Sequence, residues 1–346
     1  MAGETLPPMP PERLIELNDV AVHFSLREGL VRAVNGVSYH VNKGEVLGVV
    51  GESGSGKSVT VRSIMRLQPK TALDAGGAIR FRLPDGSVTE LNRLPRDGRE
   101  IRSIRGRHIG MVFQEPMTAL SPVHSIGTQI ARTYQLHTGA SKEAARNRAI
   151  DLLARVQMPR PREMVDVYPH QLSGGMRQRA MIALALTCEP SLLIADEPTT
   201  ALDVTTEAQI LDLLRSLQAE FGMAIIFITH NFGVVADIAD RVAVMYLGRV
   251  AETGTVDQIF YHPKHPYTRA LLQSIPRLGQ KRVHRLKTIP GMVPDPFNIP
   301  AGCVFHPRCE HAVAGRCDVA EPASRTFDGG QIARCHLADS LPELVS

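Results

Sequence analysis

The sequence predicts an α/β fold in which a core with a mainly parallel sheet carries an antiparallel β subdomain, a helical insertion and a cysteine-rich C-terminal extension. A glycine-rich loop lies between an apolar strand and a helix, later apolar strands end in polar side chains, and four of the five cysteines follow residue 300. We expect a flexible N-terminus over 1–12, the core over 13–260 with its helical insertion over 115–171, and the extension over 261–346.

The composition is that of an ordinary globular protein. Of the 346 residues, 43% are hydrophobic and 21% are charged. The 39 basic residues are nearly balanced by 35 acidic ones, so a net charge of +4 gives no reason to expect a nucleic-acid partner. No apolar run approaches the roughly 20 residues that span a bilayer, and the first residues lack the basic and apolar parts of a secretory signal. We therefore expect a cytosolic protein.

A phosphate-binding loop is the clearest motif. Residues 51–58 fit G-x-x-x-x-G-K-[ST], after the apolar strand 46–50 and before a helical pattern at Val61, Ile64 and Met65. Its backbone N–H groups and the helix N-terminus would surround phosphate, Lys57 would reach the β and γ phosphates, and the Ser58 hydroxyl would ligate Mg²⁺. The predicted nucleotide-binding residues are Gly51, Glu52, Ser53, Gly54, Ser55, Gly56, Lys57 and Ser58. The sequence predicts a protein that binds ATP or GTP.

The segments on either side of this loop predict an antiparallel sheet and a polar insertion. Alternating apolar residues at 20–24 and 37–41 predict two of its strands. Phe24 or Tyr39 could stack on adenine, and a core position in the sheet is the alternative for each. Residues 70–105 are polar and contain turn signals, so we expect strands and loops there.

A glutamine and a helical segment follow. Residues 109–113 predict a short buried strand, after which Gln114 could reach both Mg²⁺ and the attacking water; a solvated polar residue is the alternative. Apolar residues at helical spacing, with Ser141 as an N-cap, predict the helical insertion. Beyond it, Ser173 and two glycines precede a helix over 177–186 and would form a second anion site. Because the insertion separates the two sites, we expect a partner molecule to bring them together.

The segment from Leu172 to Met176 resembles the signature motif of ABC-transporter ATPase subunits, with methionine where glutamine is usual. The preceding residues 168–171 and Met176 resemble the peptide-importer branch. This resemblance implies a P-loop NTPase core of ABC type, paired head to tail with a second ATPase domain. It also implies that each chain contacts its partner's nucleotide through Ser173, Gly174, Gly175 and Asp203, the last from the loop 201–203.

Two further strand ends carry candidate catalytic residues. The apolar strand 192–196 ends in Asp196, which could hold Mg²⁺ through water, and Glu197 could polarise the attacking water; a plain acidic loop is the alternative. The strand 225–228 precedes His230, which resembles the family's switch histidine, although Asn231 replaces the usual aspartate. We predict Glu197, His230 and Gln114 as catalytic residues and Ser58, Gln114 and Asp196 as Mg²⁺ ligands.

The cysteines of the extension predict a metal site. Their spacing is C-x5-C-x7-C-x17-C, and a reducing cytosol argues against disulfides. Four thiolates suit zinc or an iron–sulfur cluster, unliganded thiols are a further alternative, and His306, His311 and His336 could compete as ligands. The segment resembles the extension of dipeptide and oligopeptide importer ATPases, which implies a [4Fe-4S] cluster on Cys303, Cys309, Cys317 and Cys335. Cys188 is expected in the core.

The resemblance also implies partners. It predicts the ATP-hydrolysing subunit of a peptide importer, acting at the cytoplasmic face of the membrane with a second ABC ATPase subunit, two membrane permeases and an extracytoplasmic substrate-binding protein. A heterodimer of ATPase subunits is expected, and a homodimer is the alternative. Two other functions stay open: a soluble ABC ATPase that acts on ribosomes or nucleic acid, and an importer for nickel or another small solute. The cysteine extension could also act as a redox sensor.

Overall fold

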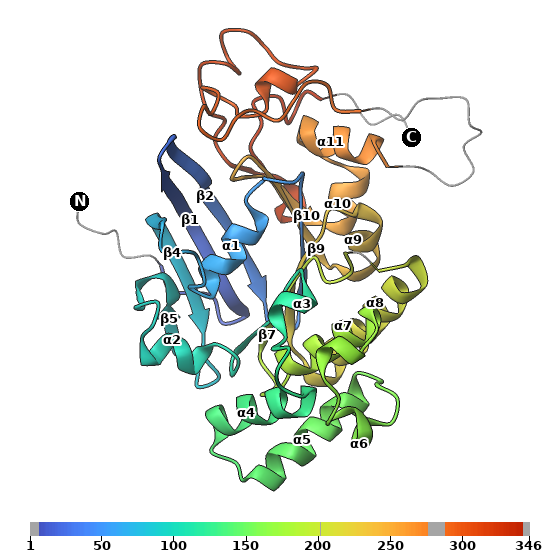
Figure 1. Cartoon of the computed structure of the whole chain (residues 1–346). Coiled ribbons are helices and arrows are strands. Elements are labelled where there is room, and N and C mark those ends of the chain that lie inside the picture. Colours follow the sequence, from blue (N-terminus) through green and yellow to red (C-terminus); the bar gives the residue numbers. More distant parts are fainter. Residues whose placement is uncertain (1–6, 201, 276–287, 342–346) are drawn as a thin grey trace.

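The computed structural model describes residues 7–200, 202–275 and 288–341. Two sheets and three groups of helices build the molecule (Figure 1). The predicted α/β architecture is confirmed: a mainly parallel sheet forms the centre, and the antiparallel sheet, helical insertion and C-terminal extension surround it. The predicted residues 1–6 of the N-terminus, and Ala201 of the partner-contact loop, lie outside the described residues.

The antiparallel sheet has the strand order β2-β1-β4-β5. Its strands are β1 (Arg13–Leu26), β2 (Gly29–Asn42), β4 (Ala72–Arg82) and β5 (Val88–Glu90). The two predicted segments 20–24 and 37–41 are the middle of one long hairpin, in which Val20 pairs with Val37. Apolar side chains alternate toward the core along these strands, as expected for a sheet with one solvated face.

The large sheet has the order β11-β12-β10-β9-β3-β8-β7-β6. Five neighbouring strands are parallel: β3 (Val46–Val50), β6 (Ile109–Val112), β7 (Leu192–Asp196), β8 (Ala224–Ile228) and β9 (Arg241–Tyr246). Every residue of β3, β6, β7 and β8 is buried, because both faces of the sheet are covered. This burial explains why these strands are continuous apolar runs in the sequence.

Helices cover the two faces of the large sheet. Helix α1 (Lys57–Ile64) lies between the two sheets, where Val61 and Ile64 join their shared core. The opposite face packs against α7 (Gly174–Ala185), α8 (Val204–Phe221) and α9 (Phe232–Ile238). Helix α7 begins three residues before the predicted start, because Ser173 already caps it.

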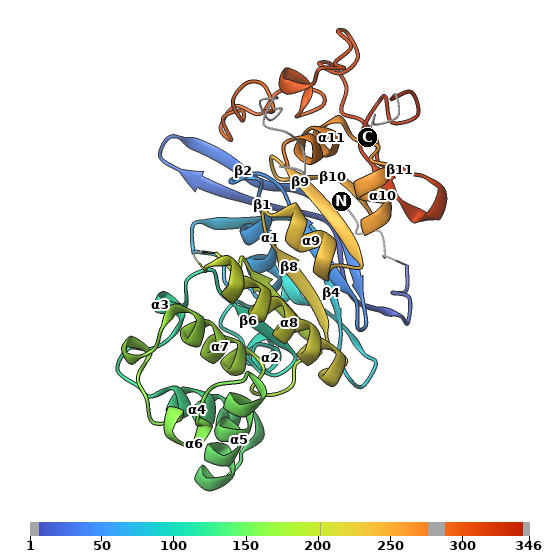
Figure 2. The same cartoon turned by 90° about the vertical axis from the view of Figure 1, so that its right-hand side faces the viewer.

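The helical insertion projects from the core beside α7, at the bottom of Figure 1. Its helices are α3 (Pro116–Ala119), α4 (Ile126–Thr138), α5 (Lys142–Arg155) and α6 (Pro161–Met164), followed by the 3-10 turn η2 (Pro169–Gln171). Ser141 accepts a hydrogen bond from the Ala144 N–H and caps α5 as expected. In the perpendicular view of Figure 2 the insertion also stands apart from the antiparallel sheet.

The segment 70–105 contains more regular structure than predicted. Besides β4 and β5 it forms the turn η1 (Leu91–Arg93) and helix α2 (Arg99–Ile104). The prediction of strands and loops alone was wrong at α2. Ile101 and Ile104 are buried on one side of this short helix, and a single pair of apolar residues among arginines gives too weak a periodicity to reveal it.

The C-terminal extension adds strands to the large sheet. Antiparallel β10 (Arg249–Thr255) pairs with β12 (Ile332–Ala333), which pairs with β11 (Arg325–Thr326). The remaining elements are α10 (Val256–Tyr261), α11 (Pro266–Gln273) and the turns η3 (His306–Arg308) and η4 (Asp328–Gly330). The predicted boundary at residue 260 falls inside α10. Phe305 and Tyr267 join a core that β9 and β10 supply, so the extension needs no large core of its own.

Within the part of the chain that the structure describes, the helices fall short of the length and apolar character needed to cross a membrane.

Candidate functional site

The glycine-rich loop joins β3 to α1, as its motif predicts, and its lysine points back into the loop. Lys57 Nζ donates hydrogen bonds to the backbone oxygens of Gly51, at 2.7 Å, and Glu52, at 3.0 Å. Burial lowers the pKa of Lys57, while nearby carboxylates, Glu197 foremost, oppose that shift. Gly56 has a φ of 95°, and a Cβ there would lie 2.4 Å from the Ala33 backbone oxygen. The loop conformation therefore requires glycine at this position.

Ser58 and Asp196 meet at the carboxyl edge of the parallel sheet. The Ser58 hydroxyl donates to Asp196 Oδ1 at 2.9 Å. Asp196 is 1% exposed, its burial raises its pKa, and its Oδ2 is buried without a hydrogen-bond partner. A buried carboxylate oxygen with no donor suits a hard cation, since Mg²⁺ takes oxygen ligands. These two residues therefore fit the predicted magnesium site.

The other two predicted catalytic residues, Gln114 and His230, lie next to Glu197. Its Oε2 accepts hydrogen bonds from Gln114 Nε2 and Thr200 Oγ1, each at 3.0 Å. His230 Nδ1 lies 3.5 Å from its Oε1. Glu197 has a φ of 47°, an uncommon conformation for a side chain of this size. The ends of β6, β7 and β8 thus bring Gln114, Glu197 and His230 together.

Asn231 has a local structural role beside the histidine. Its side chain accepts a hydrogen bond from the Gly233 N–H at 3.0 Å and caps α9. Asparagine and aspartate are comparably good N-caps, so the replacement of the family's aspartate preserves the start of this helix.

An open hollow of about 940 Å³ lies over these groups. Its lining includes residues 53–58, Gln114, Glu197 and, on the other side, residues 31–33. Neither aromatic candidate for adenine stacking is among the lining residues: Tyr39 is 5% exposed in the core, and Phe24 packs partly buried against the same core. Phe24 pairs with Val31, which does line the hollow.

The signature segment and Asp203 lie side by side at the N-termini of α7 and α8. Ser173 accepts from the Met176 N–H, and Asp203 accepts from both the backbone and the hydroxyl of Thr206. These hydrogen bonds lower the pKa of Asp203. A Cβ at Gly175 would lie 2.9 Å from Thr206 Cγ2, so the two helix starts are in contact. The lining described for the chain's own hollow does not include Ser173, Gly174, Gly175 or Asp203.

The four cysteines of the extension line one small cavity. A backbone N–H approaches the sulfur of Cys317 at 3.5 Å, from Val313, and of Cys335 at 3.3 Å, from Leu337. Burial raises the pKa of Cys309 to about 11 and of Cys335 to about 12.

The four cysteines are suitable ligands for a thiolate-bound metal centre, although their side chains do not have the geometry of a metal site. Four sulfurs line one cavity, and two of them accept backbone hydrogen bonds of the kind that stabilises cluster thiolates. In the described ranges, however, no group of three His, Cys, Asp or Glu side chains has metal-binding geometry. His306 and His336 line the same cavity, but each holds one ring nitrogen against a backbone carbonyl oxygen. Cys188 is half-buried after α7, and burial raises its pKa.

The motifs did not reveal several residues at this site. Thr200 was missed although it follows Glu197 closely, and the conformation of the intervening turn determines its contact. Pro296, from the extension, lines the nucleotide hollow. Arg308 and Tyr267, also from the extension, bind Glu52 of the phosphate loop. No local pattern signals such contacts, since the paired residues are more than two hundred positions apart in sequence.

Comparison with known families divides the chain into two matches. Residues 34–200 match the ABC transporter family, and residues 251–317 match the oligopeptide/dipeptide transporter C-terminal region. The second match includes three of the four clustered cysteines and ends at Cys317.

Curated relatives cover nearly the whole chain. The oligopeptide transport ATP-binding protein OppD of Bacillus subtilis (strain 168) is 50% identical over 333 residues, which are 96% of this chain and 91% of that protein. The dipeptide transport ATP-binding protein DppD of Escherichia coli (strain K12) is 46% identical over 323 residues, which are 93% of this chain and 96% of that protein.

Solved structures of ATP-binding cassettes share the fold. A dimeric post-hydrolysis state of the cassette MJ0796, bound to ADP and Pi, has a TM-score of 0.61 and 29% identity, and covers 70% of this chain and 99% of that one. CbiO1 of Clostridium perfringens, part of an ABC transporter complex, has a TM-score of 0.59 and 27% identity, and covers 72% and 91%. These similarities match the core that the motifs predict.

Proposed function

This chain belongs to the ATP-binding subunits of ABC peptide importers, and from that membership we propose how its residues bind and hydrolyse ATP. The chain is an ATPase that energises peptide import. The alternatives of a soluble ABC ATPase on ribosomes or nucleic acid, and of an importer for another solute, are not favoured by these relatives.

The observation that carries the proposed mechanism is the convergence of Gln114, Glu197 and His230 beside the phosphate loop. We assign the triphosphate to residues 51–58, of which residues 53–58, including Lys57, line the hollow. Ser58 and Asp196 would hold Mg²⁺, with Gln114 as a further ligand. The cation would supply charge neutralisation of the β and γ phosphates.

Glu197 is the proposed general base. Gln114 and Thr200 fix one of its carboxylate oxygens, so the other is left to face the attacking water. A carboxylate fixed this way can orient the water and accept its proton as the bond to the γ phosphate forms in line. His230, which is largely exposed beside Glu197, would contact the γ phosphate. No covalent intermediate is needed, because positioning and charge stabilisation supply the catalysis.

A partner domain would complete the site. Ser173, Gly174 and Asp203, which are exposed, and the half-buried Gly175 form one patch that does not line the chain's own hollow. We propose that this patch contacts the nucleotide held by the partner's phosphate loop. The MJ0796 cassette, which shares the fold, is dimeric in its post-hydrolysis state.

We further propose residues 13–260 as the ATPase domain, with 115–171 as the surface that contacts membrane subunits, and residues 261–346 as the extension. Two permeases, an extracytoplasmic binding protein and a second ATPase subunit would complete the importer, with this chain peripheral at the cytoplasmic face. Purification of the chain with coexpressed permeases, followed by peptide uptake into liposomes, tests this assembly. We expect Lys57→Ala to abolish uptake, while uptake of nickel but not peptide would contradict the proposed substrate.

For the extension we propose a [4Fe-4S] cluster on Cys303, Cys309, Cys317 and Cys335. The shared cavity and the backbone hydrogen bonds to sulfur support this assignment. Such a centre would supply a covalent cross-link within a segment that has few apolar contacts of its own. Protein purified without oxygen should be brown and carry about four irons with matching labile sulfide. Colourless protein with one zinc per chain would reject the cluster in favour of the zinc alternative.

A further inference from the structure

An arginine of the cysteine-rich extension reaches into the phosphate loop. Arg308 lies on η3, next to Cys309, and its side chain is only 4% exposed. Its Nη1 donates to Glu52 Oε2 at 2.7 Å, and its Nη2 donates to Glu52 Oε1 at 3.1 Å. The two parallel hydrogen bonds form the bidentate fork that makes arginine–carboxylate pairs directional and strong.

Glu52 is thereby held at three points. Besides its carboxylate, its N–H donates to Tyr267 Oη at 3.0 Å, and its backbone oxygen accepts from Lys57 Nζ at 3.0 Å. Tyr267 lies on α11 and is fully buried. Two groups downstream of β10 therefore fix the second residue of the loop, and this residue in turn contacts the lysine that would bind phosphate.

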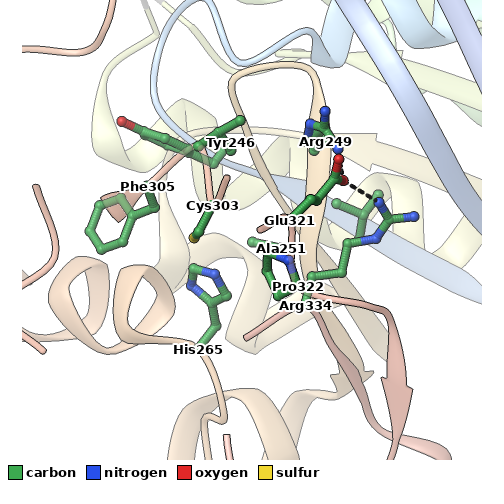
Figure 3. A pocket seen from close by; sticks show the side chains of 11 residues that line it. Tyr246, Arg249, Ala251, His265, Cys303, Phe305, Glu321, Pro322 and Arg334 are labelled. Atoms are coloured by element: carbon green, nitrogen blue, oxygen red, sulfur yellow. Dashed lines mark hydrogen bonds and ion pairs between the residues drawn. The ribbon is translucent and has the colours of Figure 1, made fainter. Parts of the chain in front are cut away.

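The path from the cysteine cavity to Glu52 is tightly packed. Arg308 Nε donates to the Pro290 backbone oxygen at 3.0 Å, and its guanidinium lies 5.8 Å from the Tyr246 ring centroid. The rings of Tyr246 and Tyr267 are 4.6 Å apart, and each lies 5.2 Å from the ring of Phe305. Figure 3 shows Tyr246 and Phe305 beside Cys303 in the pocket that these residues line.

The same extension touches the nucleotide hollow at a second place. Pro296 is among its lining residues. The neighbouring Phe297 ring lies 3.4 Å from the position that a Cβ on Gly29 would occupy, at the start of β2. The extension thus contacts the phosphate loop through Arg308 and lines the hollow through Pro296.

We propose that Arg308 is a positioning residue for nucleotide binding, which couples the cysteine-rich extension to the phosphate loop. It holds Glu52 so that the loop is arranged for the triphosphate before ATP arrives. Without this fork the loop must be ordered during binding, which weakens affinity. Coupling of this kind is reciprocal, so bound nucleotide also stabilises the extension around its cysteines. This inference rests on the proposed function only in taking residues 51–58 as the ATP site.

Arg308→Met is the first test, measured on the full chain by titration with a fluorescent ATP analogue and by steady-state ATPase kinetics. We expect the Kd to rise on the order of 10-fold, because ordering of the loop then opposes binding. The rise in KM should exceed the fall in kcat, because the arginine touches neither the water nor the leaving phosphate. A variant whose Kd and KM equal those of the parent would overturn the proposal. Failure of the parent chain itself to bind ATP would instead refute the proposed function.

A double-mutant cycle with Glu52→Gln separates coupling from general damage. If the fork carries the effect, Arg308→Met should add little to Glu52→Gln, whereas additive losses in affinity contradict a direct link. Arg325→Met is the matched control, since Arg325 forms an exposed ion pair with Asp339 in the same extension. The Arg325→Met variant should bind the ATP analogue with the affinity of the parent chain. If Arg308→Met does not fold, Arg308→Lys keeps the charge but loses the fork, and unchanged affinity in that variant also overturns the proposal.

Thiol labelling gives a readout that does not depend on hydrolysis. The rate at which a thiol reagent modifies the extension cysteines is measured with and without a non-hydrolysable ATP analogue and Mg²⁺, in protein with the same metal content. Reciprocity predicts that the analogue slows labelling several-fold in the parent chain and in Arg325→Met, but not in Arg308→Met. Equal protection in all three would show that Arg308 does not transmit the effect.

Discussion

At the scale of single residues, Glu197 combines a strained backbone with a carboxylate fixed by two donors. Its φ of 47° places a non-glycine residue in the left-handed region, at the turn directly after β7. Such conformations persist where the surroundings fix them, and they concentrate at functional sites. The backbone of Glu197 is fixed by its N–H, which donates to the Ile228 oxygen at 3.0 Å. The fold thus holds the proposed base in one place before substrate binds.

Glu197→Gln should separate binding from hydrolysis. Glutamine keeps the size and one oxygen but cannot accept the proton of water, so we expect ATP hydrolysis to fall at least about 100-fold while ATP affinity stays near that of the parent. Both are measured on the purified chain. Glu220→Gln is the control, because that carboxylate lies near the end of α8 and its side chain is 47% exposed. Full hydrolysis in Glu197→Gln would remove Glu197 from the mechanism.

His40 should make the fold sensitive to mild acid. Its Nε2 lies 3.1 Å from Arg241 Nη1 on β9, and burial, followed by the charges of Arg241 and Arg13, lowers its pKa from 6.5 to about 4, against weaker opposition from Glu16 and Glu12. Between pH 6.5 and about 4, His40 therefore binds a proton in the unfolded chain but not in the folded chain. The contribution of neutral His40 to the free energy of unfolding is complete above pH 6.5 and is lost as the pH falls toward 4.

His40→Gln tests that expectation, since glutamine offers an acceptor without a titration. Between pH 7.5 and 5.5 the free energy of unfolding of the parent should fall by about 1 kcal/mol more than that of the variant. Melting temperatures at the two pH values measure the difference. His170→Gln is a suitable control because His170 is exposed on η2. Parallel pH profiles for parent and His40→Gln would contradict the assignment.

At the scale of elements, the sequence predicted the strands that a local apolar pattern determines, but not the contacts between distant segments. The strands β3, β7 and β8 are apolar runs because both faces of their sheet are covered, and the motifs that follow them lie at one sheet edge as parallel topology requires. Strands β11 and β12 contain two residues each and exist only because β10 offers an edge. The Arg308–Glu52 pair depends on how the extension folds back, which no local pattern encodes.

The extension should depend on Glu252 of β10 for its attachment. This carboxylate is 1% exposed and accepts hydrogen bonds from the N–H groups of Lys264, at 2.6 Å, and His265, at 3.1 Å, and from Gln331 Nε2, at 2.8 Å. Glu252→Ala would leave these buried donors unpaired and destabilise the docked extension by about 3 kcal/mol.

Limited proteolysis measures this loss, because a loosened extension is cut before the core. Glu321→Ala is the control: Glu321 lies between Arg249 and Arg334 in Figure 3, but its side chain is 41% exposed. Its removal should change the cleavage rate less than removal of Glu252, since a partly exposed carboxylate stays solvated and its ion pairs contribute less stability. Cleavage of Glu252→Ala at the same rate as the control would show that other contacts hold the extension.

At the scale of the whole molecule, the phosphate loop and the signature patch belong to different faces of the chain. The hollow over residues 53–58 does not include the patch at Ser173, Gly174, Gly175 and Asp203. Figures 1 and 2 both show α7, which carries the patch, on the side of the helical insertion, while α1 lies between the two sheets. Each chain therefore carries two complementary halves of a nucleotide site, the phosphate loop and the signature patch. Two chains in opposite orientation would complete two sites.

Complementation between two inactive variants tests this arrangement. Lys57→Ala removes the phosphate-loop lysine, and Gly174→Asp places a carboxylate in the signature patch; each variant alone should hydrolyse little ATP. Gly174→Asp should still bind ATP, because its own loop is intact. A one-to-one mixture contains dimers in which one of the two sites pairs an intact loop with an intact patch, so the mixture should be several-fold more active than either variant alone.

The result of the mixing experiment distinguishes a dimer with shared nucleotide sites from a monomer that hydrolyses ATP by itself. In an obligate pair with a different ATPase subunit, the mixture of these two variants stays inactive, and activity returns only when the coexpressed second subunit supplies the intact patch. A monomer that hydrolyses ATP by itself makes a different prediction: Gly174→Asp then keeps full activity, and the rate per chain does not change on dilution. That result would contradict the partner role proposed for Ser173 to Gly175, because a site complete within one chain leaves this patch without a nucleotide to contact.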